Sequence, residues 1–150
     1  MAKELTGQEV ISEISTRLRA RFNTTQFKEI YKDKPVQGME LPCIFIESVN
    51  TVSTPQLHRY SMWDYSIDIR CHPEKMRTNV ETWARGLAVM IIETVSKLEI
   101  SGQQVKATRF DWRVVDDVLH VYCNYSFRVI QTETPLPDMQ TLLYGERIKN

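Results

Sequence analysis

The most regular pattern in the chain is an alternation of apolar and polar residues from Val118 to Gln131. Successive side chains of a β-strand point to opposite faces, so one face of this segment should pack and the other should meet solvent or a partner. A further strand is expected near residues 105–115, and Asp116 and Asp117 between the two predict a tight hairpin turn. The packed face of the second strand comprises Leu119, Val121, Cys123, Tyr125, Phe127 and Val129.

Other strands are predicted in the first half of the chain. Residues 63–71 alternate in the same way, the apolar run 43–49 suits a strand, and a short strand is expected at 27–31. The polar segment 50–56 contains Pro55 and predicts a turn. On the polar face of the 63–71 strand lie Asp64, Ser66, Asp68 and Arg70.

Two amphipathic helices are predicted, each opened by a capping box with Thr as the N-cap and Glu three residues later. The first box joins Thr6 to Glu9, and the helix is expected to end near Asn23. The second joins Thr78 to Glu81 and precedes a broad apolar face that should be buried against a sheet. This second helix is expected to continue through Leu98 and to end at Ser101–Gly102.

The order of predicted elements is α-β-β-β-α-β-β. Clustered strands with hairpin-length connections favour an α+β fold, with a mostly antiparallel sheet of four to five strands and two helices packed on one face. A chain of 150 residues is long enough for one domain with a real core. We therefore expect a single domain over residues 1–131 and an extended C-terminal tail over residues 132–150, which would act as an interaction arm.

Composition and motifs argue against several functional classes. Lys+Arg and Asp+Glu are 19 each, and zero net charge disfavours a general nucleic-acid binder. No apolar run is long enough to span a membrane, so no membrane partner is expected. The three cysteines lie far apart without a C-x-x-C pair, which suits reduced core thiols rather than a zinc site. No nucleophile motif or phosphate-binding glycine loop occurs, so we expect no enzyme and no cofactor.

A few polar and aromatic residues remain as candidates. Asp64 with Asp68, and Asp116 with Asp117, are paired carboxylates that suit a metal or acid–base role, although a solvated strand face and a turn explain them more simply. Tyr60 and Tyr122 suit an oligomer interface, where tyrosine is enriched.

Several segments together resemble a known family. They are Leu41-Pro42-Cys43-Ile44-Phe45-Ile46, Arg59-Tyr60 leading into Tyr65-Ser66-Ile67-Asp68-Ile69, the strand Val118 to Phe127, and Met139-Gln140-Thr141-Leu142. This pattern resembles the tail terminator family of contractile-tailed phages and of phage-tail-like bacteriocins of Gram-positive bacteria, the PBSX-like type. Family members often have Asp-Gly where this chain has Asp116-Asp117, which makes a type I′ turn less assured.

The resemblance implies a structural role in a virion or phage-tail-like particle that is assembled in the bacterial host cytoplasm. Such proteins form a ring, usually a homohexamer, that caps the head-proximal end of the tail tube. The ring stops tube and sheath polymerisation and joins the tail to the neck, collar or head. The partners implied are the chain itself, the tube and sheath proteins and a neck or head-completion protein. DNA would only pass through the lumen, for which Asp64, Asp68, Asp116 and Asp117 are candidate lining acids.

Alternatives remain at the level of sequence. A nucleic-acid-binding or head–tail connector accessory protein of a phage is the second hypothesis. A ring closed head to tail needs two different patches on each subunit, and an exposed strand edge can supply one. The tail can supply the other by lying on a neighbour, unless it folds back on its own subunit. The candidate interface residues are Leu136, Met139, Leu142, Leu143 and Tyr144 in the tail, with Tyr60, His120 and Tyr122 in the strands.

Overall fold

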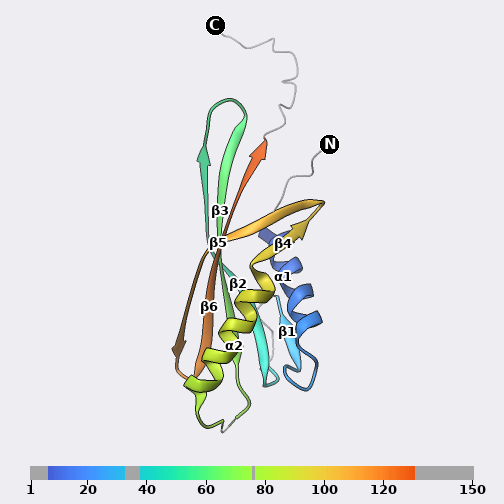
Figure 1. Cartoon of the computed structure of the whole chain (residues 1–150), viewed down its shortest axis with the longest axis vertical. Helices are drawn as coiled ribbons and strands as arrows, with labels where there is room; N and C mark the ends of the chain where they lie inside the picture. The colour runs from blue at the N-terminus through green and yellow to red at the C-terminus, as the bar shows by residue number, and fades with distance from the viewer. Residues whose placement is uncertain (1–6, 33–37, 76, 131–150) are drawn as a thin grey trace, which may run out of the picture.

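The computed structural model describes residues 7–32, 38–75 and 77–130. Within them, two helices pack on one face of a six-stranded sheet with strand order β1-β2-β3-β6-β5-β4 (Figure 1). The elements are α1 (Gly7–Arg21), β1 (Glu29–Tyr31), β2 (Cys43–Pro55), β3 (Tyr60–His72), α2 (Val80–Val95), β4 (Lys97–Ile100), β5 (Gln103–Val115) and β6 (Val118–Ile130). The α+β class is confirmed, with more strands than the four to five expected.

The sheet is mixed because β1 pairs parallel with β2, whereas every other strand pair is antiparallel. The apolar phases of β3 and β6 are buried in the core, as the alternation predicted. Tyr125 of β6 is fully buried there, and its hydroxyl donates a 2.7 Å hydrogen bond to the carbonyl of Val95, the last residue of α2. Since the apolar stripe of α1 is buried in the same core, both helices and the sheet share one hydrophobic interior.

The turn predicted at residues 50–56 is wrong. Strand β2 continues to Pro55 and pairs with β3 almost to its end, with a register shift between Ser48 and Asn50. Beyond Glu47 all of β2 is exposed, so this half carries no apolar alternation that a sequence pattern could reveal. Pairing with β3 determines its conformation instead, and Pro55 is tolerated at the strand end.

The end and the beginning of the second helix also differ from the prediction. The helix stops at Val95, and Lys97–Ile100 form β4, which pairs with β5. Leu98 and Ile100 are buried at a spacing of two, so they belong to a strand rather than to the helical stripe. The N-cap is Asn79, which has a left-handed backbone and no capping bond from its side chain, so the predicted Thr78 capping box is wrong.

Both tight hairpin turns are formed by residues with positive φ. Asp116 and Asp117 both have positive φ, 51° and 62°, as a type I′ turn requires, and they join β5 to β6 as predicted. Ser101 and Gly102, with φ of 52° and 79°, join β4 to β5 in the same way rather than ending a helix.

Thr6 of the first capping box and the tail over residues 132–150 lie outside the described residues. None of the helices that the structure describes is long and apolar enough to cross a membrane.

Candidate assembly surfaces

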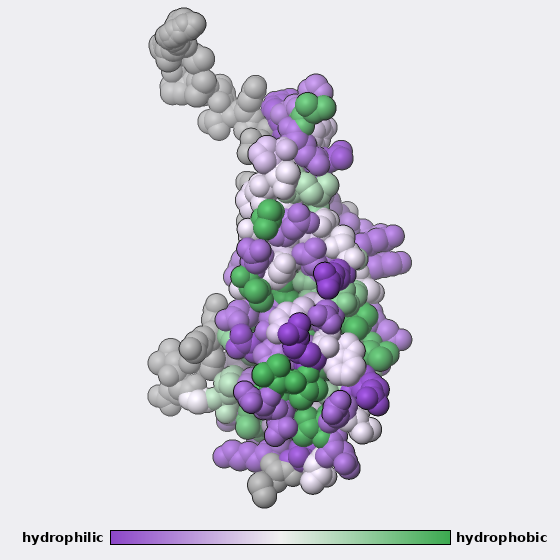
Figure 2. Space-filling model, turned by 90° about the vertical axis from the view of Figure 1, so that its left-hand side faces the viewer, coloured by the Kyte–Doolittle hydropathy of each residue, from purple (hydrophilic) through white to green (hydrophobic). Residues whose placement is uncertain are grey.

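The face of the sheet turned away from the helices carries the polar phase of the long strands. Across it, Asp68 of β3 lies opposite Tyr122 of β6, and Tyr122 lies opposite Asp111 of β5. One step along, Arg70, His120 and Arg113 form the next row. Figure 2 views this side and shows hydrophilic residues interleaved with small apolar groups. The face is therefore chemically mixed rather than an apolar area or a field of one charge.

Asp68 is the centre of a buried polar network on this face. It is only 3% exposed, and its Oδ2 accepts a 3.0 Å hydrogen bond from Nε of Arg70 and lies 3.1 Å from Nδ1 of His120. Arg70 also donates to Glu47 of β2 at 2.5 Å. The hydrogen bond to Asp68 raises the pKa of the Arg70 guanidinium, and the charge of Glu47 adds to the rise. Because three neighbouring strands contribute, the network fixes their side chains relative to one another.

Arginine side chains on this face lie over aromatic rings. The guanidinium of Arg113 sits 5.2 Å from the ring centroid of Tyr122, and that of Arg128 sits 5.2 Å from the ring of Tyr60. His120 stacks on Tyr122 with ring centroids 5.9 Å apart. Cation–π contacts of this kind hold long side chains close to the sheet. This face is therefore a shaped, ordered surface of the sort that a protein partner can recognise.

Two strand edges of the sheet are open within the described ranges. Strand β1 covers only Cys43–Phe45 of β2, so the outer edge of β2 from Glu47 to Pro55 has no pairing strand. On the opposite border β4 pairs only as far as Lys106, which leaves β5 uncovered from Thr108 to Val115. The free part of β2 belongs to an arm, formed with β3, that extends beyond both helices (Figure 1). Long open edges are templates for pairing with another chain.

A comparison with known proteins then identifies the family. The family model described as phage tail terminator protein matches residues 9–137, which is most of the chain. This chain belongs to the phage tail terminator family. No curated protein matches it. Among solved structures, 26 chains match, and one of them aligns over 86% of this terminator and 98% of its own length, at 10% identity and a TM-score of 0.40, too low to assign a shared fold.

The predicted interface residues of the terminator fall into two groups. Tyr60, His120 and Tyr122 all lie on the outward face of the sheet, where His120 stacks on Tyr122 and Tyr60 lies at the other end of β3. The tail candidates Leu136, Met139, Leu142, Leu143 and Tyr144 lie outside the described residues. The open edge of β2 was missed at the sequence level because the segment that carries it was assigned to a turn.

The four candidate lumen acids of the terminator do not form one cluster. Asp64 and Asp68 share the outward face, where Asp64 accepts a hydrogen bond from the hydroxyl of Ser126 and Asp68 is buried in its network. Asp116 and Asp117 are exposed at the β5–β6 turn, beyond the Leu119 end of β6. No group of three or more potential metal ligands occurs in the part of the chain that the structure describes.

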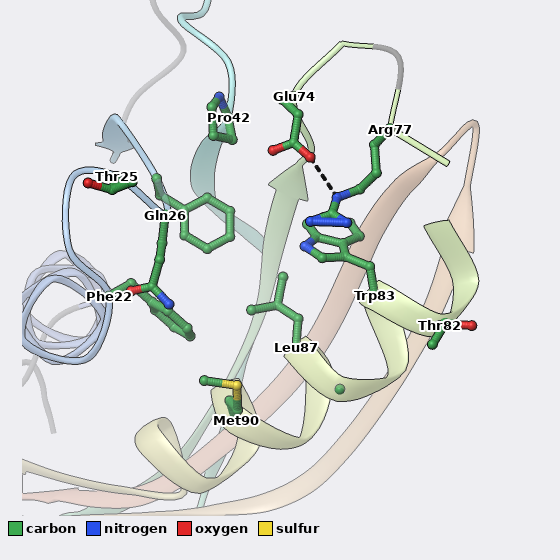
Figure 3. Close-up of a pocket in the computed structure, with 12 residues that line it drawn as sticks. Phe22, Thr25, Gln26, Pro42, Glu74, Arg77, Thr82, Trp83, Leu87 and Met90 are labelled. Atoms are coloured by element: carbon green, nitrogen blue, oxygen red, sulfur yellow. Dashed lines mark ion pairs between the residues drawn. The ribbon is translucent and has the colours of Figure 1, made fainter. Parts of the chain in front are cut away.

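One hollow of the terminator lies on the helix side, between the end of α1 and the first half of α2. This groove has a volume of about 490 Å³ and is floored by Phe22, Phe27, Leu87 and Met90. Figure 3 shows Arg77 stacked on Trp83 at one wall, with Gln26 facing it from the other. The Arg77 guanidinium is 5.1 Å from the Trp83 ring, and its Nε lies 2.8 Å from Glu74. We call this hollow the Trp83 groove.

The three cysteines of the terminator are free and buried. Burial raises the pKa of the Cys43 thiol to about 11 and that of Cys123 to about 12. Burial also raises the pKa of Cys71 well above its ordinary value. Thiols with raised pKa values are poor nucleophiles, so these residues serve as core side chains.

Proposed function

We propose that this terminator forms a homohexameric ring on the head-proximal end of a tail tube. In that position it halts polymerisation of tube and sheath and offers the surface to which the neck, collar or head binds. The particle is a contractile phage tail or a phage-tail-like bacteriocin of the PBSX-like type, assembled in the host cytoplasm. The observation that supports this role most directly is the match of the terminator family model to residues 9–137.

Ring closure is best explained by the two open edges of the sheet. The free edge of β2 and the free edge of β5 lie on opposite borders of one sheet and differ in sequence. Pairing of one edge with the other edge of the next subunit is a head-to-tail contact, and such contacts generate rings when the rotation closes. Each subunit would thereby extend the sheet of its neighbour and cover both edges against unwanted pairing.

Two further parts of the proposal concern the tail and the lumen. The tail over residues 132–150 binds a neighbouring subunit through its apolar residues, while Tyr60, His120 and Tyr122 contribute to contacts made by the outward face. DNA passes through the lumen without being a ligand, and the candidate acids that reach solvent at the β5–β6 turn, Asp116 and Asp117, line part of that passage.

The decisive experiment removes the gene from a producing strain and measures tail length by negative-stain electron microscopy. Tails that lack the terminator should be overlong and headless, and the wild-type chain supplied in trans should restore a uniform length. Light scattering of the purified chain should give a particle of six 17.6 kDa subunits, alone or on short tubes. Unchanged tail length after deletion would refute the capping role.

A further inference from the structure

The Trp83 groove has the chemistry of a site for a proline-rich segment. Proline-rich peptides in the polyproline II conformation bind in grooves lined by aromatic rings, and polar side chains at the rim bind their free carbonyls. Here the Trp83 ring, held by Arg77, forms one wall. Phe22 and Phe27, which pack edge to face at 5.4 Å and are only 1% and 3% exposed, lie beneath the opposite side as part of the floor.

A donor stands at the rim of this groove. The side-chain oxygen of Gln26 accepts a 3.0 Å hydrogen bond from the backbone N–H of Asn23, which fixes the orientation of the amide. Its nitrogen is thereby turned toward the groove (Figure 3). An amide N–H₂ in that position suits a backbone carbonyl of a bound extended peptide. The groove thus combines an aromatic wall, the Trp83 ring, with a positioned donor.

The chain itself contains a matching segment. Residues 135–137 read Pro-Leu-Pro and follow Ile130, the last residue of β6, by only a few positions. Proline fixes φ near −65° and lacks an N–H, so such a segment loses little conformational entropy when it binds. Leu136 between the two prolines adds an apolar side chain to the segment.

The length of the chain decides which copy supplies this segment. The hydrogen bond from Tyr125 to Val95 joins β6 to the end of α2. Seen from this bond, the start of α2 and the end of β6 lie in opposite directions (Figure 1). Trp83 lies about 18 Å along the helix on one side, and Ile130 about 17 Å along the strand on the other. With the two elements taken as collinear, Trp83 is about 35 Å from Ile130, whereas the chain from Ile130 to Pro137 spans at most about 25 Å.

We propose that the Trp83 groove binds the Pro135–Pro137 segment of a second copy of the chain. This inference rests on the proposed ring and names the site on the neighbour where its tail binds. Each subunit gives its proline segment to one neighbour and receives that of another, so the contact is head to tail, in agreement with the two different open edges of the sheet.

Disulfide trapping in the assembled particle tests this inference. Two differently tagged full-length variants, Gly86→Cys in the groove and Leu136→Cys in the tail, are co-expressed in the producing strain and mildly oxidised. Gly86 lines the groove, and a Cβ built on it meets nothing within 4 Å, so the new thiol should be tolerated. The matched control replaces Gly86→Cys by Val89→Cys, because Val89 is 52% exposed on the same helix and does not line the groove.

The expected product is a disulfide between one chain of each tag, at least about tenfold more abundant than with the control, since bridging requires Cα atoms within about 7 Å. Absence of this product in particles with normal tail length would overturn the inference and leave the capping function intact. A bridge formed only inside a single chain that carries both cysteines would also overturn it, because the tail would then bind its own subunit.

A steric variant provides an independent test. Gly86→Arg fills the mouth of the groove and Gly86→Ala leaves it open, while both improve the helix propensity of α2. Tail-length control and ring recovery should be lost or reduced with Gly86→Arg and retained with Gly86→Ala. Equal ring recovery for the two variants would overturn the inference. Failure of the wild-type chain to restore tail length would instead refute the proposed function.

Discussion

The hydrogen bond from Tyr125 to Val95 gives the sharpest prediction about the stability of the fold. The last four carbonyls of a helix have no partner within the helix, and Val95 is the final residue of α2. Tyr125 is fully buried and supplies the donor at 2.7 Å from the central strand of the core. Tyr125→Phe removes this donor and keeps the ring, so the change isolates the hydrogen bond without making a large cavity.

A buried acceptor left without a donor costs about 1–3 kcal/mol. We therefore expect Tyr125→Phe to lower the free energy of unfolding by about 2 kcal/mol, which corresponds to a fall in Tm of about 4–8 °C for a chain of this size. Urea unfolding followed by circular dichroism measures the loss. The midpoint should fall while the denaturant slope stays the same, because the surface exposed on unfolding is unchanged.

Tyr122→Phe is the matched control, since it makes the same chemical change on the outward face of the same strand. Tyr122 is only partly buried, and its contact with Arg113 is made by the ring, which phenylalanine retains. Its stability should change by less than about 0.5 kcal/mol. Equal losses of stability in the two variants, or a loss below about 0.5 kcal/mol for Tyr125→Phe, would refute the role of the Tyr125 hydroxyl in capping helix α2.

Three further predictions concern other parts of the molecule. Asp68→Ala leaves Arg70 and His120 without their shared buried acceptor. The free energy of unfolding, measured by chemical denaturation, should fall by about 1–3 kcal/mol, and an unchanged value would show that the network is dispensable. Gly86→Ala should raise the thermal midpoint, since alanine in a helix is favoured over glycine by up to about 1 kcal/mol and the added methyl meets no neighbour. The Cys43 thiol should react with an aromatic disulfide reagent at pH 8 about a hundredfold more slowly in the folded than in the unfolded chain, because a pKa raised from 9.0 to about 11 reduces the thiolate fraction by that factor. A fast reaction of Cys43 before unfolding would contradict its burial.

The sequence predicted those parts of the fold in which burial imposes a period. Strand β6 and the second half of β3 each have one face in the core, so their alternation was readable. The prediction assigned the residues of β4 to the preceding helix, because Leu98 also fits a helical spacing of three to four residues from Val95. The distal half of β2 left no pattern, since both of its faces are exposed and only pairing with β3 holds it.

The candidate surfaces were predictable to a similar degree. The outward face of β6 followed from periodicity, and with it the positions of His120 and Tyr122. The network around Asp68 was not predictable, because it joins residues from β2, β3 and β6 that only strand register brings together. The Trp83 groove was missed for the same reason, because its two walls come from segments far apart in the chain.

The charge on the outward face bears directly on the lumen hypothesis. The carboxylates there, such as Asp64 and Asp68, alternate with the guanidinium groups of Arg70, Arg113 and Arg128 on adjacent strands. The electrostatic fields of opposite charges so close together largely cancel beyond the Debye length, which is about 8 Å at physiological ionic strength. Such a face neither attracts nor repels DNA strongly, which suits contacts between proteins. An acidic passage for DNA would therefore depend on the exposed pair at the β5–β6 turn, and the sheet face is better suited to the contacts that hold the assembly together.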